Sequence, residues 1–278
     1  MRGAPRRSAR FPFHRTSGIY AGKLTPILAL NLLAAGGLLF AFEESTIAGK
    51  LILAVLLIGS IFSWSVMITK MRVVGFARKQ SAQFRKAFRK DRQPLRLFET
   101  NARFTGSPLY NVYRAGCEEM TYQLLGSTEV DETFRARLGD ADKITPAQMG
   151  GVHAAMERAV GETALKLESQ MILLASAVSG APFLGLLGTV WGVMDTFTDV
   201  AIAGSPNIAT MAPGVSGALI TTVMSLCVAI PAMFGYNFLV TSIRGIIVEM
   251  DNFAAELASL FEHRYVDHGA RAAEGFRR

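Results

Sequence analysis

Four stretches of the sequence are apolar and contain no Asp, Glu, Lys or Arg, and they cover residues 27–42, 51–69, 171–194 and 215–240. A helix that crosses the hydrocarbon core of a bilayer needs about 20 such residues. The last three stretches are long enough, whereas the first has only 16 residues. The apolar stretches therefore predict a polytopic membrane protein, and they explain why only 18% of the residues are charged.

Basic residues are distributed unevenly between these stretches. Residues 1–24 contain six basic and no acidic side chains, and residues 70–100 contain ten basic and two acidic ones. The connection 195–214 has two Asp and no Lys or Arg. Because Lys and Arg near helix ends stay on the cytoplasmic side, we expect residues 70–170 and the C-terminal tail in the cytoplasm and residues 195–214 outside. The net charge of +7 then reflects topology. With no nucleic-acid-binding motif in the sequence, we expect no nucleic acid partner.

The first apolar stretch allows three interpretations. Residues 27–42 could span the membrane, which would place residues 43–50 in a short outer turn and give four spans. They could belong to a cleaved signal peptide, although the basic region is long and no clean small-x-small site precedes Glu43. They could also form an interfacial helix, which the short length favours.

The remaining residues favour helices. Phe84, Phe88 and Leu95 recur at helical spacing within 78–98, and a second helix is expected over 107–125. Thr145, followed by Pro and then by Gln148, is typical of a helix start with a capping box. We expect one long helix from this cap into the third apolar stretch, and the fourth stretch to continue helically to Leu260. The predicted fold is all-α, with long helices that extend into a helical cytoplasmic domain.

Catalytic and metal-binding motifs are missing from the sequence. Cys117 and Cys227 have no neighbouring cysteine, so we expect both to be buried for structural reasons. The histidines lack metal-ligand spacing, and there is no nucleophile elbow. The glycine-rich run 185–192 lacks the Gly-Lys-Ser/Thr ending of a phosphate loop. We therefore expect no enzymatic activity, no metal and no cofactor.

Small and hydroxyl-bearing residues form stripes on the last two apolar stretches. One face of the third carries Pro182, Gly185, Thr189, Gly192 and Thr196, and one face of the fourth carries Ala218, Thr222, Ser225 and Ala229. Gly188 and Gly192 form a small-xxx-small pair, which lets membrane helices approach closely. The stripes could join the helices to each other, or they could line a narrow pore that receives another helix. Because these two stretches contain no charged residue, a proton path along them would need a carboxylate from another polypeptide.

Two membrane motifs resemble the TolQ/ExbB/MotA family of proton-channel proteins. They are Ser-Gly-Ala-Pro-Phe-Leu-Gly-Leu-Leu-Gly-Thr-Val-Trp-Gly-Val-Met-Asp-Thr-Phe at 179–197 and Met-Ala-Pro-Gly-Val-Ser-Gly-Ala-Leu-Ile-Thr-Thr at 211–222, followed by Ala-Ile-Pro-Ala at 229–232 and Tyr-Asn at 236–237. The resemblance covers about residues 51–265. Trp191 and the Asp-Asn-Phe sequence at 251–253 look most like TolQ.

The resemblance implies an inner-membrane pentamer around a dimer of a TolR- or ExbD-like single-span partner, whose membrane Asp titrates. Thr189 and Thr222 match the pore threonines of the family. The implied function is a TolQ-like stator subunit that uses the proton motive force, in a Tol-Pal system, to act on a TolA-like protein. The alternatives are an ExbB-like subunit that powers TonB-dependent biopolymer transport, or an inactive membrane scaffold.

One position departs from the family pattern. Gly217 stands where TolQ- and ExbB-type members commonly have Glu, which puts any gating role of that Glu in doubt, although MotA-type relatives lack it too. The expected organisation is a basic segment with an extra hydrophobic helix (1–50), a first family transmembrane helix (51–70), a helical cytoplasmic domain (71–168), a two-helix proton-channel domain (169–240) and a cytoplasmic helical tail (241–278).

Overall fold

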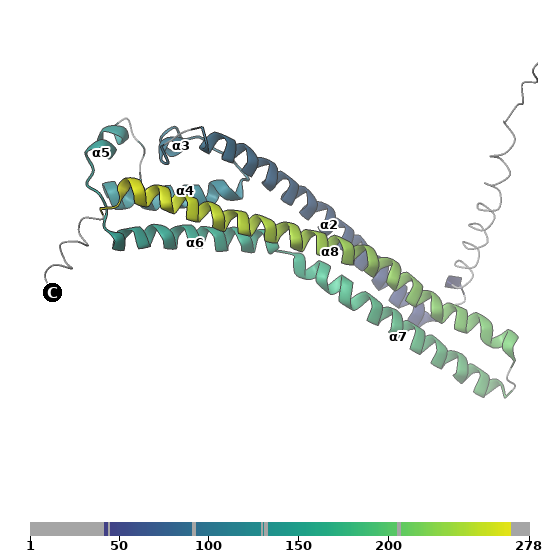
Figure 1. Cartoon of the computed structure of the whole chain (residues 1–278). Helices are drawn as coiled ribbons and strands as arrows, with labels where there is room; N and C mark the ends of the chain where they lie inside the picture. Colours follow the sequence, from purple (N-terminus) through teal and green to yellow (C-terminus); the bar gives the residue numbers. More distant parts are fainter. Residues whose placement is uncertain are drawn as a thin grey trace, which may run out of the picture. The chain divides into compact units, whose positions relative to one another are not determined.

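The computed structural model describes residues 42–43, 45–90, 93–128, 130, 133–204 and 207–267. Apart from Phe42, the first apolar stretch (27–42) lies outside the described residues. The elements are α2 (Ile47–Phe88), α3 (Arg96–Glu99), α4 (Pro108–Leu125), α5 (Phe134–Asp140), α6 (Pro146–Glu168), α7 (Met171–Ala203) and α8 (Ile208–Tyr265) (Figure 1). Every element of the described residues is a helix, which confirms the all-α prediction.

Three helices are long and apolar enough to cross a membrane, namely α2, α7 and α8. They contain 42, 33 and 58 residues, so at 1.5 Å per residue they are about 63, 50 and 87 Å long. A bilayer core is only about 30 Å thick. The chain is therefore a polytopic membrane protein whose helices α2 and α8 extend far beyond the hydrocarbon core.

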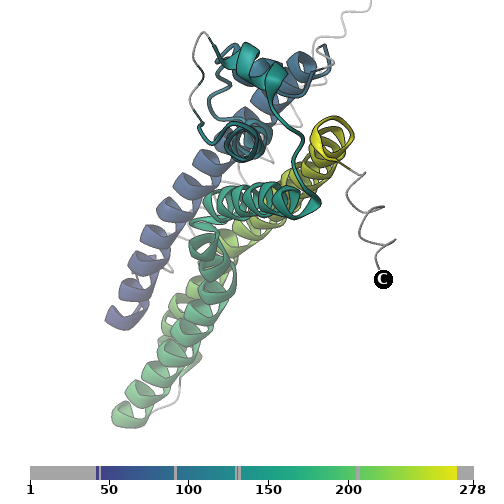
Figure 2. The ribbon, with the colours of Figure 1, turned by 90° about the vertical axis from the view of Figure 1, so that its left-hand side faces the viewer.

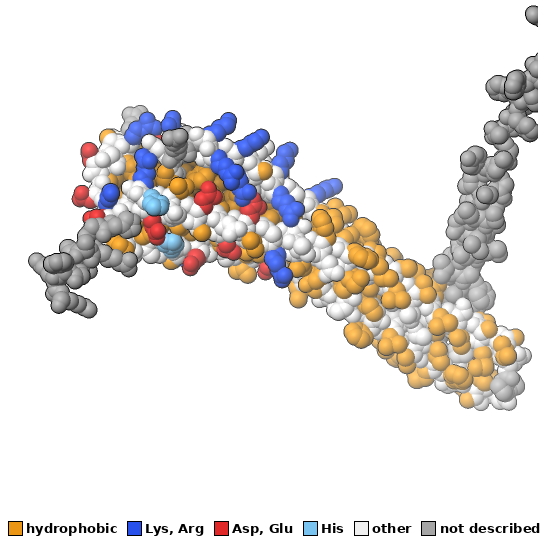
Figure 3. Space-filling view, in the orientation of Figure 1, with side chains coloured by type: hydrophobic (Ala, Val, Ile, Leu, Met, Phe, Trp, Pro, Cys, Tyr) orange, Lys and Arg blue, Asp and Glu red, His pale blue; other side chains and the backbone are white. Residues whose placement is uncertain are grey.

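The chain divides into two compact units, and α2, α7 and α8 each contribute to both. Among the described residues, unit 1 comprises residues 42–55 and Phe183–Ser225, and unit 2 comprises Leu56–Pro182 and residues 226–267. Within unit 2 we call residues 71–168 and 241–267 the helical head. Figure 3 shows Lys and Arg side chains gathered over this head, in agreement with the basic composition of residues 70–100.

The core of the helical head is an aromatic cluster centred on Phe84 of α2. The Phe84 side chain is fully buried, and its ring centroid lies 5.3–5.9 Å from those of five other rings. These five rings are Phe88, Phe104, Tyr110, Tyr113 and Phe253. Because they come from α2, the segment before α4, α4 and α8, the cluster joins segments far apart in the chain. Figure 2 shows the ribbon of these segments turned by 90° from Figure 1. Helix α4 also packs along α6.

Several buried polar groups of the helical head have partners, although the buried Thr121 hydroxyl has no hydrogen-bond partner. The Tyr113 hydroxyl donates to the Pro94 carbonyl at 2.8 Å and accepts from the Phe98 N–H at 3.0 Å. Ser107 caps α4 by accepting from the Tyr110 N–H. Helix α6 begins with the predicted capping box, in which Thr145 and Gln148 bond to each other's backbone N–H. The sequence prediction of this helix start is confirmed.

The prediction of one long helix from residue 146 into the third apolar stretch is wrong. Helix α6 ends at Glu168, and α7 begins at Met171. Ser169 is extended, with ψ of 143°, and Gln170 has a left-handed φ of 66°. Neither residue is a usual helix breaker, so local sequence gives no signal of this break.

Two further expectations need correction. The predicted helix over 78–98 is the end of α2, which stops at Phe88, and only the short α3 follows within that range. Cys117 is buried as expected, whereas Cys227 is exposed on the isolated chain. Cys227 lies in an apolar helix, where a hydrophobic thiol can face lipid or another helix.

The helical head should lose stability at alkaline pH. Burial raises the pKa of the Cys117 thiol and of the Tyr113 phenol, whereas in the unfolded chain they titrate near about 8.5 and 10. Above those values the unfolded state releases protons that the folded state retains, so stability is complete below about pH 8.5 and falls as the pH rises. Each group adds a slope of about 1.4 kcal/mol per pH unit.

The measurement is thermal unfolding of the full chain in detergent between pH 7 and 11. Cys117→Ala should flatten the decline between pH 8.5 and 10, while Cys227→Ala should leave it unchanged. Equal slopes in the wild type and Cys117→Ala would show that the thiol does not contribute.

Candidate functional site

Three glycines of α7 let α8 approach closely within unit 1. A Cβ atom built on Gly192 would lie 2.7 Å from the Cβ atom of Ala218 and 3.1 Å from its Cα atom. A Cβ atom on Gly188 would collide with the Thr221 side chain, and one on Gly185 with Ser225. Contacts of this kind are typical of membrane helices that associate through small residues.

The predicted pore-face packing residues therefore occupy the contact between α7 and α8. Gly185, Gly188, Gly192, Ala218 and Ser225 are all buried and face each other across this contact. Pro182 lies half-buried in α7 within unit 2. For the buried five, the geometry favours the interpretation that small residues join the two helices.

Thr189 and Thr222 meet beside this contact. Their hydroxyl oxygens are hydrogen-bonded to each other, and both side chains remain half-exposed. The Thr189 hydroxyl also lies 3.0 Å from the Gly185 carbonyl oxygen, and the Thr222 hydroxyl lies 3.2 Å from the same oxygen. The structure thus brings together the two threonines that the sequence singled out and leaves them accessible from one side.

The Gly185 carbonyl is approached by more hydroxyls than it can bind. Thr221 lies 3.1 Å from it as well, and as a residue of α7 the carbonyl already accepts the helical N–H of Thr189. A carbonyl oxygen has two lone pairs, so only one hydroxyl can bind at a time. Thr221 has another acceptor, the Ala218 carbonyl at 2.8 Å. One lone pair of Gly185 is therefore shared by Thr189 and Thr222.

Thr189 also lies 3.5 Å from the Ala218 carbonyl, but while Thr221 donates to that oxygen, two arrangements of the hydroxyl pair satisfy these limits. Each threonine has one hydroxyl hydrogen. Either Thr189 donates to Thr222 and Thr222 donates to Gly185, or the order is reversed. The arrangements interchange by rotation of two hydroxyl groups, without movement of heavier atoms. In both, the pair offers acceptor lone pairs to an approaching group and can turn one hydrogen outward.

Thr221 is the residue that the sequence analysis missed. Its side chain is fully buried, and its hydroxyl bonds span α7 and α8 through the carbonyls of Gly185 and Ala218. Thr221 precedes Thr222 directly, and one helical step turns it by 100° toward Gly188. Thr221 lies three residues after Ala218 and four before Ser225, so helical periodicity within α8 would have placed it on the contact face.

Other polar residues lie near the ends of α7 and α8. Asp195 and Asp199 line a cavity of about 540 Å³ together with Trp191. Thr196 is buried, donates to the Gly192 carbonyl and leaves no room for a Cβ atom on Gly214. Gly217 is buried in α8. No group of three potential metal ligands occurs among the described residues.

The close contact of α7 and α8 predicts that a larger residue at Gly192 lowers the stability of the chain. Gly192→Ala should destabilise the chain by about 1–3 kcal/mol, because the added methyl meets the backbone of Ala218 as well as its side chain. Gly180→Ala is the matched control on the same helix, since a Cβ atom there has no neighbour within 4 Å. Unfolding in mixed detergent micelles measures both variants. Equal stability of the two would contradict the contact.

Comparisons with known proteins found relatives that match most of this chain. The MotA/TolQ/ExbB proton channel family matches residues 126–252. The Tol-Pal system protein TolQ of Haemophilus influenzae is 30% identical over 227 residues, which cover 80% of this chain and 92% of that protein. TolQ of Pseudomonas aeruginosa is 30% identical over 81% of this chain and 91% of its own length. The biopolymer transport protein ExbB of Pseudomonas putida is 29% identical over 82% of this chain and 64% of its own length. The small-residue contact that brings Thr189 to Thr222 thus lies within the matched segment, and the chain belongs to the MotA/TolQ/ExbB proton channel family.

Proposed function

We propose that this chain is a TolQ-like stator subunit of the bacterial inner membrane that converts proton flow into work on the cell envelope. The observation that carries the proposal is the Thr189–Thr222 hydroxyl pair on one shared carbonyl. Thr189 belongs to stretch 171–194 and Thr222 to stretch 215–240, and neither stretch contains Asp, Glu, Lys or Arg. We call the face of α7 and α8 that carries Thr189 and Thr222 the hydroxyl wall. A wall without charged side chains suits a proton path whose titrating group comes from a partner.

The hydroxyl pair can serve both protonation states of a carboxyl group. In its resting arrangements it presents lone pairs, which accept from a protonated carboxylic acid. When one hydroxyl turns away from Gly185, it can donate to a carboxylate and stabilise the charge. An Asp in an apolar surrounding has a raised pKa and prefers the neutral form. The pair therefore lowers the cost of transient ionisation without adding a fixed charge.

A partner of the TolR or ExbD type would supply this Asp on a single membrane helix. The half-exposed side of Thr189 and Thr222 is open to such a helix. A ring of five copies of this chain would surround a partner dimer with equivalent threonine pairs. At 100 mV each proton delivers about 2.3 kcal/mol, which can move the partner between equivalent positions when the barriers are low.

Gly217 is compatible with this function. A Glu at that buried position would add a charge close to Ala218, whose carbonyl belongs to the hydroxyl network. Glycine leaves the network without a competing ionisable group. The alternative of an inactive scaffold remains as an outcome of the flux experiment.

The first experiment measures proton flux in liposomes that contain this chain and its single-span partner. Thr189→Val with Thr222→Val should reduce flux at least about tenfold, because a methyl neither donates to nor accepts from the partner carboxyl. Thr198→Val is the control, since this exposed threonine of α7 donates only to the Met194 carbonyl of its own helix. Unchanged flux in the double variant would refute the pore role. No flux in the wild type would favour the scaffold.

The second experiment separates the TolQ-like role from the ExbB-like one. The chain is co-expressed with a TolR–TolA pair or with an ExbD–TonB pair from the same organism, and complexes are analysed by native mass spectrometry. A TolQ-like subunit should form a complex of five copies with two copies of the TolR-like protein. Preferential assembly with the ExbD-like protein would assign the chain to biopolymer transport, and a stable monomer would contradict both roles.

A further inference from the structure

Lys70 is a buried charged residue at the end of an apolar stretch. It is the first charged residue after stretch 51–69 of α2, and it is only 5% exposed. Its ammonium group donates to the Leu167 carbonyl and to the Ser169 hydroxyl, each at 3.0 Å, and lies 3.5 Å from the Lys166 carbonyl. All these partners belong to the end of α6 or to the link that follows it, within unit 2.

The partners of Lys70 are neutral. Within the described ranges no carboxylate forms an ion pair with it. A buried ammonium without a counter-charge is costly. The last carbonyls of a helix lack helical partners and carry the negative end of the helix dipole. The C-terminus of α6 therefore acts as the counter-charge of Lys70.

The link between α6 and α7 is held in an unfavourable conformation. Gln170 has φ of 66°, a region that side chains with a Cβ atom rarely adopt and that persists only where surrounding contacts hold it. Ser169 and Gln170 are exposed, whereas Leu167 and Met171 on either side are buried. A two-residue exposed link between anchored turns is the arrangement of a hinge.

We propose that the α6–α7 link is a hinge and that the bonds of Lys70 hold it in one conformation. We call these bonds, to the Leu167 carbonyl and the Ser169 hydroxyl, the clasp. The Lys70 side chain reaches both the last turn of α6 and the link residue Ser169. Release of this one side chain frees the α6 carbonyls and removes the support of the left-handed Gln170. Because α7 also carries Thr189, Lys70 is a positioning residue for the helix of the hydroxyl pair.

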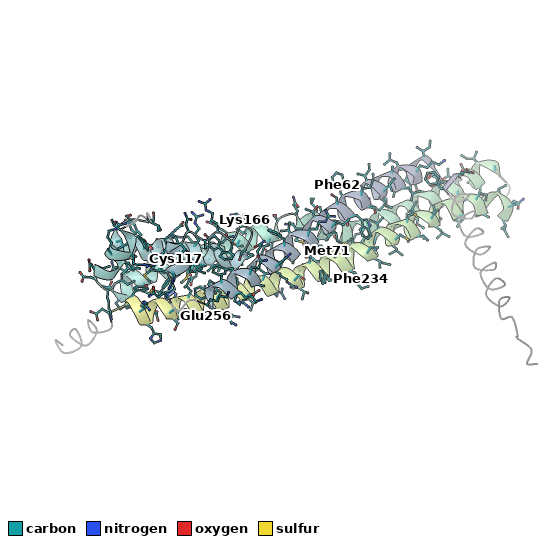
Figure 4. The ribbon with its side chains drawn as sticks, turned by 90° about the horizontal axis from the view of Figure 1, so that it is seen from above. Phe62, Met71, Cys117, Lys166, Phe234 and Glu256 are labelled. Atoms are coloured by element: carbon teal, nitrogen blue, oxygen red, sulfur yellow. The ribbon has the colours of Figure 1, made fainter. Side chains whose placement is uncertain are left out.

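Trypsin cleavage after Lys166 tests the clasp on the full chain in detergent, without any partner or proton gradient, so its outcome is independent of the proposed function. Lys166 is exposed near the end of α6 (Figure 4), but cleavage requires the last turn to open. Lys70→Met should speed this cleavage about tenfold, because charge-assisted bonds that hold the turn are lost. Lys70→Arg should stay near the wild-type rate.

Lys79→Met is the matched control, because Lys79 is an exposed residue of the same helix. Equal cleavage rates for Lys70→Met and the wild type would overturn the proposal, as would an equal acceleration in Lys79→Met. Ser169→Ala removes one acceptor of Lys70 together with the hydroxyl's own bond to the Lys166 carbonyl at 2.8 Å. It keeps the charge of Lys70, and it should speed cleavage about threefold. This milder variant carries the test if Lys70→Met fails to fold, and an unchanged rate in it would then overturn the clasp.

Spin labels at Leu165 and Ile172 provide a second measurement across the hinge. Both side chains are more than 70% exposed, at 71% and 73%, so labels there should not disturb packing. With Cys117 and Cys227 replaced by Ala, we expect one narrow distance distribution in the presence of Lys70 and a broad one in Lys70→Met. A narrow distribution in both would contradict a hinge held by Lys70.

Discussion

The hydrogen bonds that α8 donates to the Gly185 carbonyl of α7 depend on a close helix contact that only glycines permit. Gly188 and Gly192 bring α8 against α7, and this approach carries Thr221 and Thr222 to a carbonyl of the neighbouring helix. At a wider separation each threonine would bond to the carbonyl of its own preceding turn, as Thr198 does. The shared acceptor, the two hydroxyl arrangements and the accessible lone pairs all follow from the absence of three Cβ atoms.

The helical head and the contact of α7 and α8 are stabilised by different interactions. The helical head has a core of large rings around Phe84, as expected where burial from water drives packing. The contact of α7 and α8 has no aromatic core, since its buried residues are glycine, alanine and hydroxyl-bearing side chains. In lipid there is little hydrophobic gain from helix association, so close backbone approach and hydrogen bonds replace it. The composition of each part follows from its solvent.

Several features could be predicted from the sequence because they are local. The charge-free stretches predicted the membrane helices, and Thr145 and Gln148 predicted the start of α6. Helical periodicity placed Thr189 and Thr222 on the stripes of two stretches, and the family resemblance then assigned both to the pore. The break at Gln170 could not be predicted, because it rests on Lys70, which is 97 residues from Leu167 in the chain. The spacing of Thr221 from Ala218 and Ser225 places it on the contact face of α8, but its bond to the Gly185 carbonyl of α7 depends on how closely the two helices approach.

The charge distribution explains why such a wall would need a partner. A hydroxyl can pass a proton or orient it, but at physiological pH it does not hold a charge. Every polar group of the α7–α8 contact keeps one protonation state, so the wall offers no energetic preference of its own between proton positions. Under the proposed function this neutrality is an advantage. When the walls around a titrating Asp are equivalent and neutral, the proton gradient alone determines which position the Asp occupies. A carboxylate at position 217 would be repeated in every copy of the ring and would add a charge beside each position of the Asp, whereas glycine keeps the wall neutral.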